Sequence, residues 1–381
     1  MTFIESWSTT IVGRGVFFLS AWALSFNDVR NLWLAAAYGT TYVVGAFLSH
    51  RCCFRLGEKR MLVLTGAAQL AAYLALWRWL GPGVLFALFS FIGFTSGLRW
   101  PVVESYLSAG RTPRQTMGAI GTFNLCWAAG IPLALLTAGW LIHRMEASVF
   151  LLPACVNAAS LLIILPLPFR PVHLPADHPA RPGQVELARM KALTTSSRWL
   201  LLASYALSWA LAGLMPHVFG RMGFVESAPA LSGVLDFVRL LTFAGLIAWT
   251  SWHGKVAPLL LSLAAMPIGF FMVLFGGSLG AALTGETIFG LGCGLVYYSA
   301  LYHAMVVQNA SVDASGKHES LIGLGLVAGP LAGLLGAVLS GPLGGQVYGM
   351  LLGMGPVFLV CGFGSVWALR SLAGERAGAS A

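Results

Sequence analysis

Two ionisable residues, Arg99 and Glu104, lie inside a stretch that is otherwise apolar. The stretch runs from about Gly83 to Leu107, and about 20 apolar residues are enough for a helix to cross a bilayer. Charged groups at that depth are costly unless they face a polar cavity or a partner on another helix. The pair therefore predicts either a site for a solute or a proton, or an ion pair that holds helices together.

Helical geometry separates these two side chains. Successive residues of an α-helix are turned by about 100°, which places Arg99 about 140° from Glu104. Each is therefore expected to face a different helix, while Trp100 shares a face with Glu104. In the functional interpretation Glu104 carries a proton or a cation, because a desolvated carboxylate holds a proton readily. Arg99 then anchors an anionic group.

The outline of this stretch recurs about half the chain later. Gly-Phe-Thr-Ser-Gly at 93–97 is followed by Trp100, and Gly-Leu-Gly-Cys-Gly at 290–294 is followed by Tyr297 at the same spacing. Internal repeats of this kind are typical of transporters built from two related bundles around a central site. The second copy continues into Tyr298, Tyr302 and His303, which we interpret either as a solute-binding face or as packing between helices.

Composition defines the class of protein. Hydrophobic residues make up 57% of the chain and charged residues 9%, whereas soluble domains carry about 25% charged residues. This composition indicates an integral membrane protein. The net charge of +9 fits basic cytoplasmic loops, and we expect no nucleic-acid partner. The six cysteines show no metal spacing, so we expect no metal, no cofactor and no disulfide.

The apolar runs predict an all-α integral membrane protein with about twelve transmembrane helices in two pseudo-symmetric six-helix bundles. The expected spans are 8–26, 32–49, 61–79, 83–107, 117–142, 148–168, 198–219, 229–250, 256–275, 280–307, 319–340 and 345–369. A proline-rich polar stretch divides them. The expected domains are therefore an N-terminal bundle (1–169), a cytoplasmic linker (170–197) with a short helical piece at 184–193, and a C-terminal bundle (198–381).

The distribution of basic residues predicts the orientation. Most Lys and Arg residues fall on the side that holds the linker and both termini, and positive charge accumulates in cytoplasmic segments. Both termini are therefore expected in the cytoplasm, in a multi-pass protein of the cell (inner or plasma) membrane. The beginning of the chain lacks the basic segment of a cleavable signal peptide.

A basic loop after the second span points to a family. The segment 45–60 ends in Gly57, Lys59 and Arg60, while Ser49 and His50 stand where an acidic residue is usual. Together with the twelve spans, the repeat and the basic linker, this loop resembles the signature of the major facilitator superfamily. The resemblance implies alternating access to a central cavity lined by spans 1, 4, 7 and 10. It also implies gating roles for Arg51, Lys59 and Arg60.

Further candidates follow from single residues. Arg14 is expected either to reach the cavity as a partner for Glu104 or to extend to the membrane surface. Asn124 in the fifth span is expected to edge the site, ahead of its neighbour Trp127. His318 and Glu319 open the eleventh span and are either a cytoplasmic gate or a helix cap. Asp236 and Arg239 share a helix face and are expected to neutralise each other.

The predicted function is secondary active transport of a small organic solute, with coupling to protons through Glu104 as a hypothesis. The arginines suggest an organic anion or a zwitterion, and the aromatic residues suggest apolar bulk. The alternative is a transporter-like receptor or assembly partner. The sequence offers no nucleophile with a base, no metal cluster and no phosphate loop, so an enzyme is not expected. The expected partners are the solute, protons and the lipid bilayer, and the protein is expected to be a monomer.

Overall fold

A computed structural model describes residues 2–107, 110–111, 113–172, 184–308, 312–343 and 345–378, and every regular element in these ranges is a helix. The helices are α1 (Thr2–Gly13), α2 (Gly15–Ala23), α3 (Asp28–Leu56), α4 (Glu58–Arg78), α5 (Pro82–Ser105), α6 (Pro113–Met145), η1 (Glu146–Phe150), α7 (Leu151–Ile164), α8 (Gln184–Arg221), α9 (Ala228–Leu231), α10 (Val234–Ala248), η2 (Thr250–Trp252), α11 (Ala257–Phe275), α12 (Leu279–Gln308), α13 (Val312–Ser340) and α14 (Gln346–Gly378).

Ten stretches of the described residues are long and apolar enough to cross a membrane. One of them, Gly118–Ile164, is 47 residues long and contains α6, η1 and α7, so it holds two of the predicted spans. The predicted first span is interrupted at Arg14, which separates the 12 residues of α1 from the 9 residues of α2. These two features account for the difference from the twelve predicted spans, and the all-α membrane fold is confirmed.

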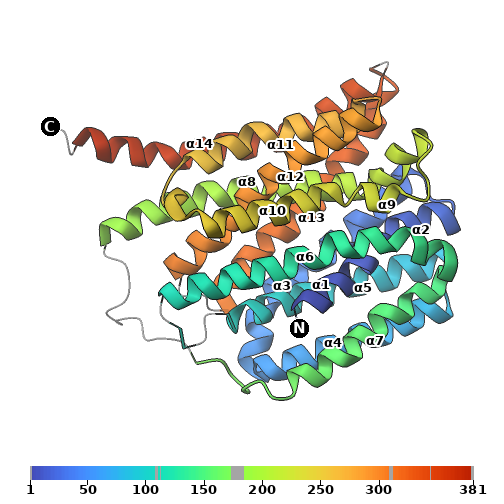
Figure 1. Ribbon diagram of the computed structural model, residues 1–381, viewed down its shortest axis with the longest axis horizontal. Coiled ribbons are helices and arrows are strands. Elements are labelled where there is room, and N and C mark those ends of the chain that lie inside the picture. The colour runs from blue at the N-terminus through green and yellow to red at the C-terminus, as the bar shows by residue number, and fades with distance from the viewer. Residues whose placement is uncertain are drawn as a thin grey trace.

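The helices form two groups that lie side by side (Figure 1). We use N-terminal half for α1 to α7 and C-terminal half for α8 to α14. The main contacts between the halves run along α3 with α13 and along α6 with α10. The predicted helical piece at 184–193 is the beginning of α8, which continues to Arg221. Residues 173–183 of the predicted linker lie outside the described residues.

The two copies of the glycine motif pack in the same way. In α5, a Cβ on Gly93 or Gly97 would meet the backbone of α3 at Tyr38 or Tyr42. In α12, a Cβ on Gly290 would meet the backbone of Leu235 in α10. The glycines therefore let the two helices of each pair approach closely. Trp100 and Tyr297 follow Gly93 and Gly290 by seven residues, so each lies on nearly the same helix face as that glycine.

Close approach also explains the glycines of α13 and α14. A Cβ on Gly325 or Gly329 would overlap the backbone of α8 near Leu202 and Ala206, and a Cβ on Gly353 would overlap α13. These glycines therefore allow close packing between the helices. As a result α13 is held against α8 on one side and against α3 of the other half on the other.

Candidate functional site

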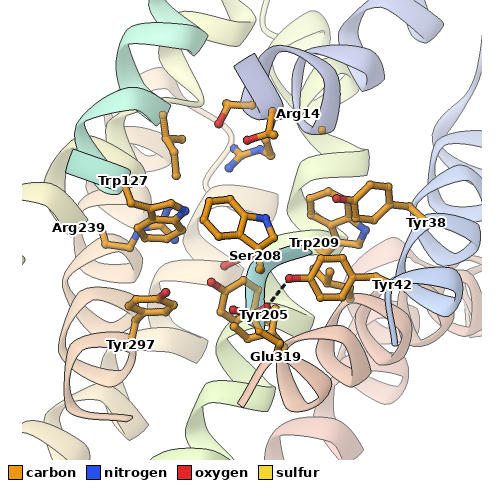
Figure 2. Close-up of a pocket in the computed structure, with 17 residues that line it drawn as sticks. Arg14, Tyr38, Tyr42, Trp127, Tyr205, Ser208, Trp209, Arg239, Tyr297 and Glu319 are labelled. Atoms are coloured by element: carbon orange, nitrogen blue, oxygen red, sulfur yellow. Dashed lines mark hydrogen bonds between the residues drawn. The ribbon is translucent and has the colours of Figure 1, made fainter. Parts of the chain in front are cut away.

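A cavity lies between the two halves, and both contribute to its walls (Figure 2). Its volume is about 160 Å³. The lining residues are Thr9, Thr10, Gly13, Arg14, Tyr38, Tyr42, Trp100, Trp127 and Ile131 of the N-terminal half and Tyr205, Ser208, Trp209, Arg239, Tyr297, Glu319, Ile322 and Leu326 of the C-terminal half. The expected spans 1, 4, 7 and 10 correspond to α1 with α2, α5, α8 and α12, and they contribute to the lining. Helices α3, α6, α10 and α13, which were not expected there, line the cavity as well.

Two arginines and one aspartate form the first polar cluster of the cavity. Arg14 lies between α1 and α2 and donates to Asp236 of α10 at 3.0 Å. Arg239 donates to the other carboxylate oxygen of Asp236, and its guanidinium lies 4.8 Å from the centre of the Trp127 ring. The predicted pairing of Asp236 with Arg239 is confirmed. Arg14 reaches the cavity, which was one of the two alternatives, but its partner is Asp236 and not Glu104.

Aromatic rings form the walls on two sides. Trp127 of α6 stacks on Tyr297 of α12, with ring centres 4.9 Å apart and planes at 11°. On the other side Tyr38 packs against Trp209 at 5.2 Å. Figure 2 shows the first pair on the left of the lining residues and the second on the right. Trp100 also lines it. The cavity therefore presents flat apolar ring faces with tyrosine hydroxyl groups at their edges.

Three buried ionisable residues form a second polar cluster where α5 meets α13. Ligand atoms of Glu104, His318 and Glu319 lie within 4.8 Å of one another, and their exposed fractions are 0%, 0% and 4%. Tyr42 of α3 donates a hydrogen bond to Glu319. Neither carboxylate oxygen of Glu104 makes a hydrogen bond of good geometry to a described residue. This cluster therefore joins elements of both halves.

The carboxylates of Glu104 and Glu319 lie next to each other, and no described residue forms an ion pair with either of them. The charge of Arg198 acts on His318. Two buried carboxylates that adjoin repel each other when both are ionised. A proton or a cation is the natural counter-charge. Two carboxylates and an imidazole at this spacing also suit a metal ion, which the sequence did not lead us to expect.

Arg99 lies away from the cavity. Its guanidinium pairs with the carboxylate of Glu5 in α1, and both side chains are buried inside the N-terminal half. The expectation that Arg99 and Glu104 face different helices is confirmed, since Arg99 faces α1 and Glu104 faces α13. The geometry places Arg99 in an ion pair that holds α1 to α5, and it does not place it where an anion in the cavity would bind.

Tyr298, Tyr302 and His303 also lie elsewhere. They pack around Trp252 in the connection between α10 and α11, with ring centres 5.6, 5.3 and 6.1 Å from it. His253 stacks on Tyr302 at 4.4 Å, and its partial burial lowers its pKa below the ordinary value. In α12 the cavity is lined by Tyr297 instead. The repeat contained the signal for this, because Tyr297 occupies the position of Trp100.

In α6 the cavity is lined by Trp127 and not by Asn124. The Asn124 side chain is fully buried, and neither atom of its amide group is hydrogen-bonded to a described residue. The two residues are three apart on one helix, so a small rotation decides which of them reaches the cavity. The order in which we ranked them from the sequence is therefore reversed.

Lys59 and Arg60, in the first turn of α4, contact their own half. Lys59 donates to the backbone oxygen of Leu165, and Arg60 lies 5.1 Å from the ring of Phe169. Arg51 is exposed. A charged latch between the halves is thus not formed by these described contacts. His318 and Glu319, the other predicted gating residues, are buried beside the cavity and not at the surface.

A further polar contact joins the two halves at the C-terminal end of α8. The sequence did not suggest it. Asp28, at the beginning of α3, is 3.6 Å from His217 and 3.8 Å from Arg221. All three side chains are partly exposed. Partly exposed ion pairs contribute little to stability, so this contact suits a connection that opens and closes.

The comparisons with known proteins agree with this architecture. The family model of the Major Facilitator Superfamily matches residues 10–337. The chain belongs to this superfamily. Among solved structures, the nucleoside transporter NupG superposes with a TM-score of 0.63 at 13% identity, covering 98% of this chain and 96% of that one. No curated protein matches the sequence.

Two further transporters of known structure share the fold of this superfamily member. The human organic anion transporter MFSD10 (TETRAN) gives a TM-score of 0.65 at 15% identity, covering 96% of each chain. A bacterial homologue of the human lysosomal transporter Spinster gives 0.58 at 15% identity, covering 96% of this chain and 94% of that one. At these identities the similarity establishes the fold and leaves the solute open.

Proposed function

We propose that this superfamily member is a secondary active transporter that carries a small organic solute through its central cavity by alternating access. The observation that carries the proposal is the cavity itself, whose walls come from both halves. Relative movement of the halves would therefore open it first to one side of the membrane and then to the other. The halves act as two bundles, 1–169 and 198–381, joined by the linker 170–197, of which the residues from Gln184 onward extend α8.

Coupling to protons is the second part of the proposal. Glu319 lines the cavity, and Glu104 lies directly behind it. The groups nearest to them, Tyr42, His318 and Tyr297, carry no permanent positive charge, and the charge of Arg198 acts on His318. A proton held by the two carboxylates would remove their repulsion, and its release would restore it. Since Tyr42 binds Glu319 across the halves, the protonation state would bias their arrangement.

The orientation and the assembly complete the proposal. The protein lies in the cell (inner or plasma) membrane with both termini in the cytoplasm, as the basic residues indicate, and it works as a monomer. The contact of Asp28 with His217 and Arg221 then lies on the outer side and closes that end of the cavity. A transporter-like receptor that moves no solute is the alternative function.

Counterflow in proteoliposomes tests the proposal. Vesicles loaded with an excess of an unlabelled compound are given a trace of the labelled compound, over a panel of amino acids, amines, organic acids, nucleosides and sugars. A carrier accumulates the label transiently, and Glu319→Gln is expected to reduce this accumulation for the active class. The exposed Glu226 supplies the matched control, Glu226→Gln. A compound that binds the protein without counterflow would favour the receptor function.

A further inference from the structure

We propose that the solute of the central cavity is a zwitterion with a ring-shaped body, whose anionic group lies at Arg14 and Arg239 and whose protonated amine lies at Glu319. This inference rests on the proposed function, because it names the class of solute that the same cavity would carry. It follows from how charges and flat aromatic faces are distributed along the cavity walls.

The arginine end of the cavity has positive charge and hydrogen-bond donors to spare. Arg14 and Arg239 both line the cavity, but they share one carboxylate, that of Asp236. An arginine has five N–H donors, and Asp236 and the Ser232 carbonyl occupy only some of them. Glu286 accepts a hydrogen bond from the Leu235 N–H at 3.1 Å, and its carboxylate interacts with Arg14 through space. It forms no ion pair with either arginine and does not line the cavity.

A carboxylate or phosphate group of the solute fits this end best. Guanidinium groups bind such anions through paired, charge-assisted hydrogen bonds. The two arginines also come from different halves of the protein, Arg14 from the N-terminal half and Arg239 from the C-terminal half. A bound anion would therefore contact both halves at once.

The opposite end of the cavity has negative charge to spare. Figure 2 shows Glu319 at the bottom of the view and Arg14 at the top. Glu319 accepts a hydrogen bond from Tyr42, and the described residues form no ion pair with it. A protonated amine would supply the missing positive charge. The faces of neighbouring tyrosine rings also attract an ammonium group.

The walls between the two ends favour a flat, cyclic body. The stacked pair Trp127 and Tyr297 lies on one side of the cavity lining and the pair Tyr38 and Trp209 on the other. Aromatic faces bind other rings by stacking. The lining residues, all of which belong to the described part of the chain, include hydroxyl groups but no Asn, Gln or Asp side chain. An uncharged sugar would leave the arginines and Glu319 without a counter-charge.

Solutes with a single charge fit only one end. A purely anionic solute would leave the Glu319 carboxylate without a positively charged partner. A purely cationic solute would leave the arginine N–H donors without an acceptor. An uncharged ring would satisfy neither end. Because buried polar groups without partners weaken binding, the zwitterion is the class that uses the whole cavity.

The test compares three probes that share one ring. 4-(Aminomethyl)benzoate carries both charges at opposite ends of the ring, benzylamine carries only the amine, and 4-methylbenzoate carries only the carboxylate. Binding to the purified full-length protein is measured by calorimetry. We expect the zwitterion to bind about tenfold or more tightly than either analogue, which corresponds to ~1.4 kcal/mol or more.

Substitutions at each end should remove one half of this preference. Glu319→Gln should abolish the advantage of the zwitterion over 4-methylbenzoate, and Arg239→Gln its advantage over benzylamine. Arg14→Gln repeats the second test if Arg239→Gln does not fold. The exposed residues Glu226 and Arg78 supply the controls, Glu226→Gln and Arg78→Gln, which should leave all three affinities unchanged.

The outcomes separate this inference from the transport proposal. Equal or tighter binding of either single-charge analogue, or no binding of any probe, overturns the zwitterion. Counterflow of benzylamine or 4-methylbenzoate without zwitterion preference also overturns it while leaving transport intact. A zwitterion that binds as expected but gives no counterflow confirms the binding site and rejects transport.

Discussion

Tyr42 donates a hydrogen bond to Glu319 across the boundary between the two halves. Tyr42 belongs to α3 and Glu319 to α13, and both side chains line the central cavity. Glu104 approaches Glu319 from α5. A movement of the halves must therefore break or rearrange a contact of the same carboxylate that would receive a proton. This links the charge of the site to the arrangement of the halves.

Replacing the donor of this hydrogen bond should destabilise the protein. Tyr42→Phe leaves the buried Glu319 without its hydroxyl partner, and an unsatisfied buried group costs about 1–3 kcal/mol. We expect a lower unfolding temperature in detergent or nanodiscs. Tyr348, which is 62% exposed, provides the control Tyr348→Phe. Equal unfolding temperatures for the two variants would show that the bond contributes nothing.

The ion pair of Arg99 with Glu5 is expected to support the fold and not solute binding. Breaking a buried pair costs about 3–5 kcal/mol, because it leaves an uncompensated charge. Arg99→Gln should therefore lower the unfolding temperature strongly, and the double variant with Glu5→Gln should recover part of the loss. The dissociation constant of 4-(aminomethyl)benzoate should change by no more than about twofold. A stable Arg99→Gln protein with lost affinity would return Arg99 to the site.

The fold was predictable because its determinants are local in the sequence. Long apolar runs define the helices, and the glycine spacing at 93–97 and 290–294 defines which helix faces pack closely. The repeat also pairs Trp100 with Tyr297 by position, although only Trp100 was among the expected site residues. Both now face the same cavity from opposite halves.

The ionic partners were not predictable in the same way. Arg14 forms an ion pair with Asp236, and Arg99 forms one with Glu5. Both pairs depend on packing between helices that are distant in sequence. The pattern along one helix contains no information about such partners. The choice of Tyr298 over Tyr297 failed for a smaller reason, since one residue along a helix turns a side chain by about 100°.

The register of α12 gives a direct test of the cavity. Tyr297→Ala removes a ring that stacks on Trp127 inside the cavity, whereas Tyr298→Ala removes a ring that packs on Trp252 outside it. We expect the first variant to weaken probe binding by about tenfold, ~1.4 kcal/mol. The second should leave the affinity unchanged. The reverse result would place the binding face of α12 one residue further along the chain.

Close packing of α13 against α8 should make Gly329 intolerant of a side chain. A Cβ at this position would overlap the backbone of Ala206, and overpacking costs typically about 1–3 kcal/mol. Gly329→Ala should therefore lower the unfolding temperature. A Cβ on Gly245 would meet nothing within 4 Å, so Gly245→Ala should be neutral or slightly stabilising. Equal effects would mean that α8 and α13 adjust freely.

Uptake driven by a pH gradient tests proton coupling through Glu104 most directly. Proteoliposomes are prepared with the wild type, Glu104→Gln and the control Glu226→Gln, and uptake of the solute that shows counterflow is followed with and without the gradient. We predict that wild type and control respond to the gradient, while Glu104→Gln exchanges solute but has lost the response. If Glu104→Gln keeps the full response, the buried carboxylate pair does not carry the coupled proton.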